Sequence, residues 1–285
     1  MGYTAAVIIG APRSGTNMLR NMLTQIPGVG TWPCDEINYI WRYGNARYPN
    51  DEFTADMATE RVRSYIRKQF DWVADRYNAH IVIEKTCANA LRIDFVESIL
   101  NSPKYVFIHR NGIDAVSSAM QRWRASVDLP YVLAKARFVP VADLPFYAMR
   151  YFGNRLSRRL SSDGYLSTWG PITAEMHAQR GNLTLAELCA SQWSACVESA
   201  LEALENIAPE RVLRISYEEL IKDRFGHATV LARFLDVDAK TMIGVPAFND
   251  MRAESIGKGR QLLDSGTIDD IVKIAGPALR RLGYR

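Results

Sequence analysis

The feature that most constrains the fold is a short apolar segment that runs straight into a glycine-containing turn. Residues 3–9 (YTAAVII) are apolar and partly β-branched, which is typical of a buried strand. The turn GAPRSG occupies residues 10–15, and residues 16–26 (TNMLRNMLTQI) then repeat apolar side chains at helical spacing until Pro27 and Gly28 end the pattern. The sequence therefore predicts a strand, a tight turn and a helix in direct succession.

The same alternation of strand and helix continues along the chain. Apolar segments at 80–85, 104–110 and 211–216 predict three more strands, and helical patterns follow each of them. Other helices are expected over about 89–100 and 183–207. Strands that alternate with helices predict an α/β fold with a parallel sheet covered by helices on both faces.

Ligands of such sheets bind at the carboxyl ends of the strands. Four polar or charged residues stand at the ends of the predicted strands or just beyond them: Arg13, Lys85, Arg110 and Tyr217. We expect them to share one edge of the sheet.

Two long segments interrupt this pattern. Residues 27–53 are rich in aromatic and turn-forming residues, and residues 125–182 contain four prolines with many tyrosines and arginines. Loops of this length are commonly lids or walls of binding sites. Because the 285 residues contain no repeat or linker, we expect a single domain over 1–285, with 125–182 as an acceptor-binding or lid insertion.

Composition restricts the partners and the compartment. The net charge of +4 suits an anionic ligand, but no dense basic stripe predicts nucleic-acid binding. The four cysteines have no CxxC pairing, which argues against a zinc site or a disulfide framework. No apolar run approaches the roughly 20 residues of a membrane span, and no signal-peptide pattern is present, so a cytoplasmic protein is expected.

The turn at 10–15 is suited to an anion, because backbone N–H groups and the helix dipole both point toward it. Gly15 allows a close approach, and Arg13 adds a planar cation that matches phosphate or sulfate oxygens. A P-loop NTPase would need Lys at position 16 and a metal-binding hydroxyl at 17, where this chain has Thr16 and Asn17. The turn thus favours an anion handled without magnesium. A structural turn and a degenerate kinase or NTPase loop remain alternatives.

A second candidate anion site lies in IHRNGIDAVSSAM, residues 108–120. Arg110 follows a strand and Ser118 lies eight residues later, about two helical turns away. Such a pair can hold a further phosphate, although each residue is commonplace by itself.

Together these segments resemble the PAPS-dependent sulfotransferases, particularly bacterial members that act on carbohydrates or natural products. PRSGTNML resembles their phosphosulfate-binding loop and FIHRNGIDAVSSAM their 3′-phosphate-binding strand and helix. Three further segments resemble family motifs in the same order: EKTCANALR, VLRISYEEL and SIGKGR. The resemblance implies a P-loop NTPase-like sulfotransferase fold, PAPS (3′-phosphoadenosine 5′-phosphosulfate) as donor, PAP as product and no metal.

The resemblance also implies roles for individual residues. Arg13 would stabilise charge on the leaving group, and Lys85 would contact the transferring sulfuryl group. Tyr217 would contact adenine, and Trp193 either adenine or the helix core. The backbone that cradles the phosphosulfate would come from Ser14, Gly15, Thr16 and Asn17. The residues that hold the 3′-phosphate would be Arg110, Ser118, Lys258, Gly259 and Arg260.

The general base is expected to be Glu36. Cytosolic relatives use a histidine two residues after the strand-end lysine, but this chain has Cys87 there. Carbohydrate-directed and bacterial relatives place a glutamate beyond the phosphosulfate loop, and Glu36 stands 23 positions after Arg13. Aromatic neighbours would desolvate Glu36 and raise its pKa. Asp35 and Cys87 are the alternative bases.

The acceptor is expected to be a small molecule that offers a hydroxyl or an amino group. Aromatic walls suit sugars and flat polar rings alike. The neighbouring carboxylates of Asp35 and Glu36 could attract a cation, and some relatives modify guanidinium alkaloids of the saxitoxin type. Two other functions remain open: a kinase or NTPase with a degenerate phosphate loop, and a catalytically inactive nucleotide-binding regulator.

Overall fold

The protein, seen here as a computed structural model, is built on a parallel β-sheet. The structure describes residues 2–124, 135, 137–147, 149, 169–178, 182–249, 251 and 253–284. Within these residues the sheet has five strands in the order β2-β3-β1-β4-β5, and every neighbouring pair is parallel. The strands are β1 (Thr4–Ile9), β2 (Val29–Gly30), β3 (Ile81–Lys85), β4 (Lys104–His109) and β5 (Val212–Ser216).

The position of β1 at the centre of the sheet explains why its own sequence is a continuous apolar run. Its side chains alternate between two separate cores: Val7 and Ile9 face one, and Ala6 and Ile8 face the other. All four are completely buried. A strand covered on both faces needs apolar side chains at every position, so the period-2 alternation of a half-exposed strand is absent.

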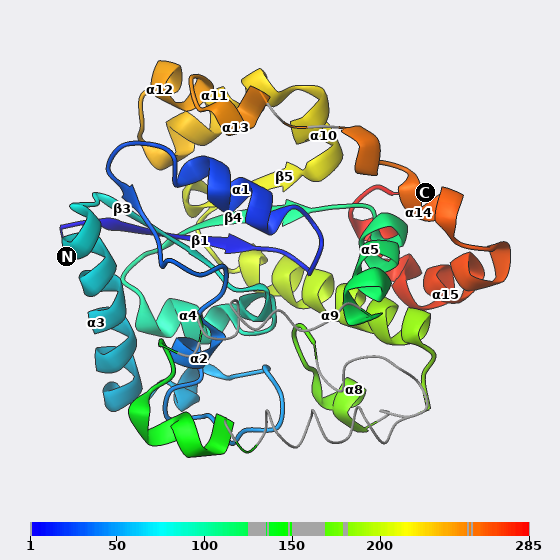
Figure 1. Cartoon of the computed structure of the whole chain (residues 1–285), viewed down its shortest axis with the longest axis horizontal. Helices are drawn as coiled ribbons and strands as arrows, with labels where there is room; N and C mark the ends of the chain where they lie inside the picture. The colour runs from blue at the N-terminus through cyan, green and yellow to red at the C-terminus, as the bar shows by residue number, and fades with distance from the viewer. Residues whose placement is uncertain are drawn as a thin grey trace.

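Helices cover both faces of the sheet, as expected (Figure 1). One face carries the N-terminal helix α1 (Thr16–Leu23) and four helices from the C-terminal part of the chain. These four are α10 (Tyr217–Lys222), α11 (Arg224–Leu235), α12 (Ala239–Ile243) and α13 (Pro246–Asn249). The other face carries α3 (Glu60–Tyr77), α4 (Ile93–Ile99), α9 (Leu185–Glu205) and α15 (Ser265–Arg281). Two further helices, α5 (Gly112–Arg124) and α14 (Lys258–Leu262), stand beyond the carboxyl ends of the strands.

Local sequence determines where the long helices start. Thr184 and Glu187 form a reciprocal capping box at the start of α9, and the side chains of Thr59 and Asp264 cap α3 and α15. These caps satisfy backbone N–H groups that the first helical turn leaves unpaired. No helix of the described residues is long and apolar enough to cross a membrane.

The segment 27–53 contributes to the core in addition to the expected wall of a binding site, which Asp35, Glu36, Asn38 and Tyr39 help to form. It contains β2 and the short helix α2 (Asn38–Trp41). Trp32 and Trp41 are buried, and both make edge-on contacts with the Phe70 ring in the core. Burying these large rings stabilises the fold, so they do not face a ligand.

The segment 125–182 lies partly outside the described residues. Its described parts include a short 3₁₀ helix at Val141–Asp143 and α8 (Ala174–Ala178). The remainder of the predicted insertion lies outside the described residues.

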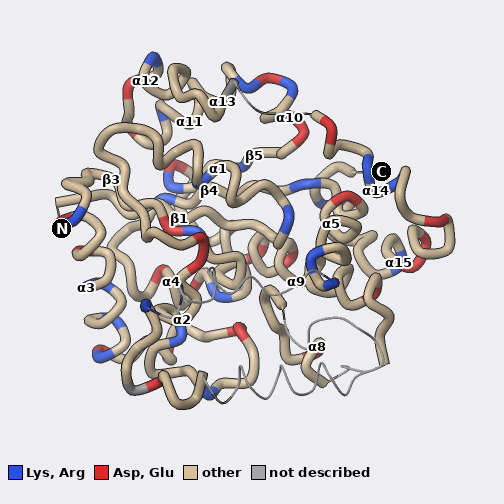
Figure 2. The backbone as a smooth tube through the Cα atoms, viewed as in Figure 1, with Lys and Arg blue, Asp and Glu red and all other residues tan. Residues whose placement is uncertain are grey.

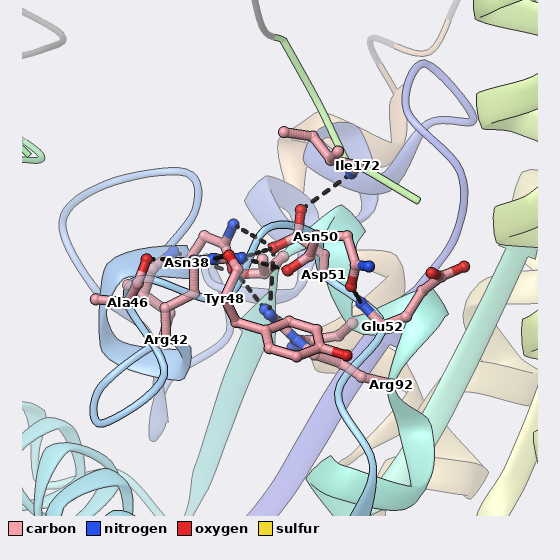
Figure 3. Close-up of polar contacts among 12 residues, drawn as sticks. Asn38, Arg42, Ala46, Tyr48, Asn50, Asp51, Glu52, Arg92 and Ile172 are labelled. Carbon is pink, nitrogen blue, oxygen red and sulfur yellow. Dashed lines mark hydrogen bonds and ion pairs between the residues drawn. The ribbon is translucent and has the colours of Figure 1, made fainter. Parts of the chain in front are cut away.

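The buried carboxylate of Asp51 connects these two segments (Figure 3). Its Oδ1 accepts hydrogen bonds from Arg42 at 2.7 Å and Asn38 at 3.3 Å, and it forms an ion pair with Arg92 at 3.5 Å. Its Oδ2 accepts from the N–H of Ile172 at 3.0 Å, and its own N–H donates to the Ile172 carbonyl at 2.7 Å. Residues 169–172 are thus attached to the segment that precedes α3.

Candidate active site

A cavity of about 950 Å³ lies at the carboxyl edge of the sheet. The residue pairs of the parallel strands bring the ends of β1, β3 and β4 side by side, so loops that are far apart in sequence meet there. Basic positions of α5 and α14 lie around the same edge (Figure 2). The predicted residues that line the cavity are Arg13, Gly15, Thr16, Asn17, Glu36, Lys85, Arg110, Ser118, Tyr217, Lys258 and Gly259.

Two predicted residues do not line it. Ser14 is fully buried in the turn, and its hydroxyl has no hydrogen-bond partner among the described residues. Arg260 is exposed on α14 and is outside the cavity lining.

The turn between β1 and α1 is a close-fitting cradle. Gly15 has a φ of 91°, in the left-handed region, and a Cβ there would lie 2.6 Å from Cδ2 of Tyr217. Arg13 also has a positive φ, of 69°, which is costly for a residue with a side chain. No side chain caps the N-terminus of α1. The first N–H groups of α1 are therefore available to an anion at the cavity.

The two predicted anion-binding clusters meet directly. The Nε of Arg13 donates to the Ser118 hydroxyl at 2.9 Å, and Arg110 donates to the Arg13 carbonyl at 3.2 Å. Arg110 also donates to the carbonyl of Ser255, and its guanidinium lies 4.8 Å from the centre of the Tyr217 ring. The Nε of Arg110 is buried without a partner among the described residues. Arg13, Ser118 and Arg110 therefore converge on one space.

Helix α14 is docked on α5 by Asp114, a residue that the sequence analysis missed. Its two carboxylate oxygens each accept a backbone hydrogen bond at 2.7 Å, from Gly257 and Gly259. A Cβ at Gly259 would lie 2.6 Å from the carbonyl oxygen of Ile113, so only glycine fits this approach. This docking brings Lys258 to the cavity. An aspartate in the first turn of a predicted helix was the available signal.

Glu36 and Lys85 form a close ion pair at the cavity wall. The Nζ of Lys85 donates to Oε1 of Glu36 at 2.8 Å, and the N–H of Cys87 approaches the same oxygen at 3.4 Å. The Lys85 side chain is 1% exposed and the Glu36 side chain 26% exposed. Glu36 thus reaches the cavity, whereas Lys85 lies almost wholly beneath it.

The predicted direction of the Glu36 pKa shift was wrong. Burial does raise the pKa of Glu36, but the positive charges of Lys85 and Lys135 and the hydrogen bond from Lys85 outweigh it, so the pKa is lowered. Burial lowers the pKa of Lys85, and Glu36 more than reverses this, so that pKa is raised. Both groups are charged at neutral pH.

The two alternative bases differ in their surroundings. Burial, together with the negative charge of Glu36, raises the pKa of Cys87 to about 12, so its thiol keeps its proton at neutral pH. Asp35 lines the cavity but forms an ion pair with Lys135 at 3.0 Å. Trp193 is 2% exposed and packs against Gly112 at the start of α5, so it belongs to the core and not to the cavity lining.

Several cavity residues were not anticipated from the sequence. Helical spacing from Ser118 could have indicated Arg122, one turn further along α5. Lys135 and the wall formed by Trp169, Gly170 and Pro171 lie in the predicted acceptor-binding insertion 125–182, but no sequence signal pointed to them individually. Among the described residues, no three His, Cys, Asp or Glu side chains are grouped so that they could hold a metal ion.

The structure is that of an α/β protein with a parallel sheet, and a strand-to-helix turn and two arginines at the edge of this sheet are suited to an anionic ligand. Residues 6–133 match the model of the sulfotransferase family.

Solved structures share the fold across nearly the whole chain. The sulfotransferase domain of the Synechococcus PCC 7002 olefin synthase aligns over 99% of this chain and 96% of its own, with a TM-score of 0.54 and 16% identity. The sulfotransferase domain of the curacin biosynthetic pathway aligns over 99% and 98%, with a TM-score of 0.55 and 14% identity. The mouse sulfotransferase SULT7A1, solved with PAP, aligns over 97% and 85%, with a TM-score of 0.51 and 15% identity. No curated protein sequence matches the chain significantly.

Proposed function

We propose that the protein transfers a sulfuryl group from PAPS to a hydroxyl or amino group of a small acceptor, such as a carbohydrate or a natural product. One observation carries this proposal: the cradle at Gly15, the Arg13–Arg110 pair and the Glu36–Lys85 pair all open into a single cavity. A donor anion and a proton acceptor can therefore act on one reacting group. The family match and the PAP-bound mouse relative support this reading.

The donor fits the residues at the β1–α1 turn. The amides of residues 15–17 would donate hydrogen bonds to the 5′-phosphosulfate, with the close approach that Gly15 permits, whereas the amide of Ser14 already donates to the Ala11 carbonyl. Arg110 and Ser118 would hold the 3′-phosphate, with Lys258, Gly259 and Arg260 closing from α14. Tyr217 would contact the adenine.

The side chains of Arg13 and Ser118 form a hydrogen bond with each other in the structure. When PAPS binds, we expect both side chains to give up this bond and to form hydrogen bonds with oxygens of PAPS. The guanidinium of Arg13 would then face the bridging oxygen between phosphate and sulfur. It would stabilise the negative charge that develops there as the S–O bond breaks.

The proton that the acceptor loses during transfer would be taken up by a residue of the protein. As the acceptor oxygen or nitrogen bonds to sulfur, Glu36 takes the acceptor proton and the bridging S–O bond breaks, which leaves the electron pair on PAP. Lys85 keeps Glu36 ionised before the reaction, because its ammonium lies 2.8 Å from the carboxylate. The same ammonium would then turn toward the sulfuryl oxygens as Glu36 becomes neutral.

The proposed unit is one domain over residues 1–285, with the segment 125–182 contributing to the acceptor wall. Lys135 and Trp169 support this, because both come from that segment and line the cavity. A cationic acceptor such as a guanidinium alkaloid is the least favoured, since each of the two carboxylates that would attract it already pairs with a lysine.

The donor site is tested by calorimetric titration with PAP, with and without a chelator, and with ATP plus Mg²⁺. Tight PAP binding that ignores the chelator is expected. Metal-dependent ATP binding without PAP binding would replace the proposal with a kinase or NTPase.

The base is tested with Glu36→Gln and the matched Asp35→Asn, using labelled PAPS and a panel of hydroxyl and amino acceptors. Glu36→Gln should abolish transfer and leave PAP affinity nearly unchanged. Transfer that survives in Glu36→Gln but is lost in Asp35→Asn would assign the base to Asp35. Wild-type PAP binding without any turnover would indicate an inactive regulator.

A further inference from the structure

The charges that line the cavity are unequal in number. Among the described residues, six lysine or arginine side chains line it, against three carboxylates. Each carboxylate has a cation partner: Asp35 has Lys135 at 3.0 Å, Glu36 has Lys85 at 2.8 Å and Asp114 has Arg110 at 3.9 Å. The three remaining cations are Arg13, Arg122 and Lys258.

Two of these three cations belong to the donor end of the cavity. Arg13 lies in the anion cradle itself, and Lys258 begins α14, which Asp114 holds against the start of α5. Their charges are accounted for by a donor with two separate anionic groups. Arg122 has no such assignment.

Arg122 lies toward the other end of the cavity. It is one turn beyond Ser118 on α5, about 6 Å further from the carboxyl ends of the strands. Its neighbour Trp123 contacts the ring of Trp169 at a centroid distance of 6.1 Å. This end of α5 is therefore next to the wall at 169–171.

The guanidinium of Arg122 is half-buried and has no ion-pair or hydrogen-bond partner among the described residues. It is close enough to Arg13 for repulsion between them to contribute to the lowered pKa of Arg13, after the larger effect of burial. Two cations that face each other across a cavity repel until an anion comes between them or beside them. The arrangement is that of a site prepared for an oxyanion.

We propose that Arg122 binds an oxyanion on the acceptor, so that the substrate is an acidic small molecule whose hydroxyl or amino group is presented to Glu36. This inference rests on the proposed sulfuryl transfer. A guanidinium offers two parallel N–H donors that match a carboxylate or a tetrahedral oxyanion, and such charged pairs are stronger than neutral hydrogen bonds. Because the cavity carboxylates are already paired, a neutral or cationic acceptor would leave Arg122 uncompensated.

The test uses the PAP-saturated protein and a matched pair of probes, 4-hydroxybenzoate and 4-hydroxybenzamide, which differ mainly in charge. Calorimetry should give tighter binding of the acid, by about tenfold or more, because hydrogen bonds to charged groups are the stronger kind. Arg122→Gln should remove that preference. Arg124→Gln is the control, since Arg124 is exposed on the same helix and outside the cavity lining.

Equal binding of the two probes, or no measurable binding of either, would overturn the proposal, as would a preference that Arg122→Gln leaves intact. A loss of PAP affinity in Arg122→Gln equal to the loss of acid affinity would make Arg122 a donor ligand, which also overturns it. A different result would contradict the proposed function itself: a wild-type protein that does not bind PAP at all.

Discussion

Gly15→Ala is the sharpest test of the anion cradle. Gly15 precedes α1 with a φ of 91°, and an added Cβ would lie 2.6 Å from Cδ2 and 3.1 Å from Cε2 of Tyr217. The Tyr217 ring cannot move away freely. It is 8% exposed, its hydroxyl shares a hydrogen bond of 2.7 Å with Ser255, and the Arg110 guanidinium lies over its face.

The expected cost has two parts. A left-handed backbone conformation costs a residue with a Cβ about 1–2 kcal/mol. Overpacking against a held ring adds about 1–3 kcal/mol. The free energy of unfolding of Gly15→Ala should therefore fall by about 2–5 kcal/mol.

Gly283→Ala is the matched control, because Gly283 has a similar φ of 79° and no atom lies within 4 Å of its would-be Cβ. It should lose only the backbone part, about 1–2 kcal/mol. Urea denaturation of both variants measures the difference, and calorimetry with PAP measures the site. Equal losses in the two variants would refute the packing argument, and unchanged PAP affinity in Gly15→Ala would refute the cradle.

Four further predictions concern charge. Arg13→Ala should lower turnover about 10²–10³-fold, because a lost donor to a developing oxyanion costs about 2.7–4 kcal/mol; a change of only a few fold would contradict the leaving-group role. In the wild type, turnover and the stability that Glu36 contributes should both persist above its ordinary pKa of 4.5 and be lost only as the pH falls through the lowered value. Lys85→Met leaves burial as the main influence on that pKa, so the acid limb of the pH–rate profile should move to higher pH, and an unmoved limb would exclude Glu36 as the base. Asp51→Asn should cost about 3–5 kcal/mol in urea denaturation, because it leaves two buried arginines uncompensated, whereas the exposed Asp56→Asn should cost almost nothing.

The fold and the donor end of the cavity could be predicted because their determinants are local. The apolar run of β1, the turn at 10–15 and the helical pattern of α1 are consecutive in the chain, and each element follows from its own residues. Because the strands are parallel, their carboxyl ends bring Arg13, Lys85 and Arg110 to one edge of the sheet. This could be predicted without knowing any side-chain contact. The segment 27–53 was only partly predicted: Asp35 and Glu36 line the cavity, but Trp32 and Trp41 belong to the core.

The acceptor end could not be predicted, because its determinants are pairings between distant residues. Lys135 forms an ion pair with Asp35, which is 100 positions earlier in the sequence, and the Ile172 N–H donates to Asp51, which is 121 positions earlier. No local pattern specifies either contact. Both depend on how the segment after α5 packs against the segment before α3.

The Glu36 pKa shows how such a pairing can reverse a conclusion drawn from local sequence. Its aromatic neighbours argued for desolvation and a raised pKa, and desolvation is indeed the largest single influence. Lys85, which is 49 positions away, lowers the pKa below its ordinary value by proximity alone. The same pairing bears on what the cavity can attract: lysines compensate Asp35 and Glu36, whereas Arg122, which also lines the cavity, has no ion-pair partner among the described residues. Two neighbouring carboxylates in the sequence therefore predict a cationic ligand only if no cationic side chain from elsewhere in the fold pairs with them. In this protein, a lysine pairs with each of the two carboxylates.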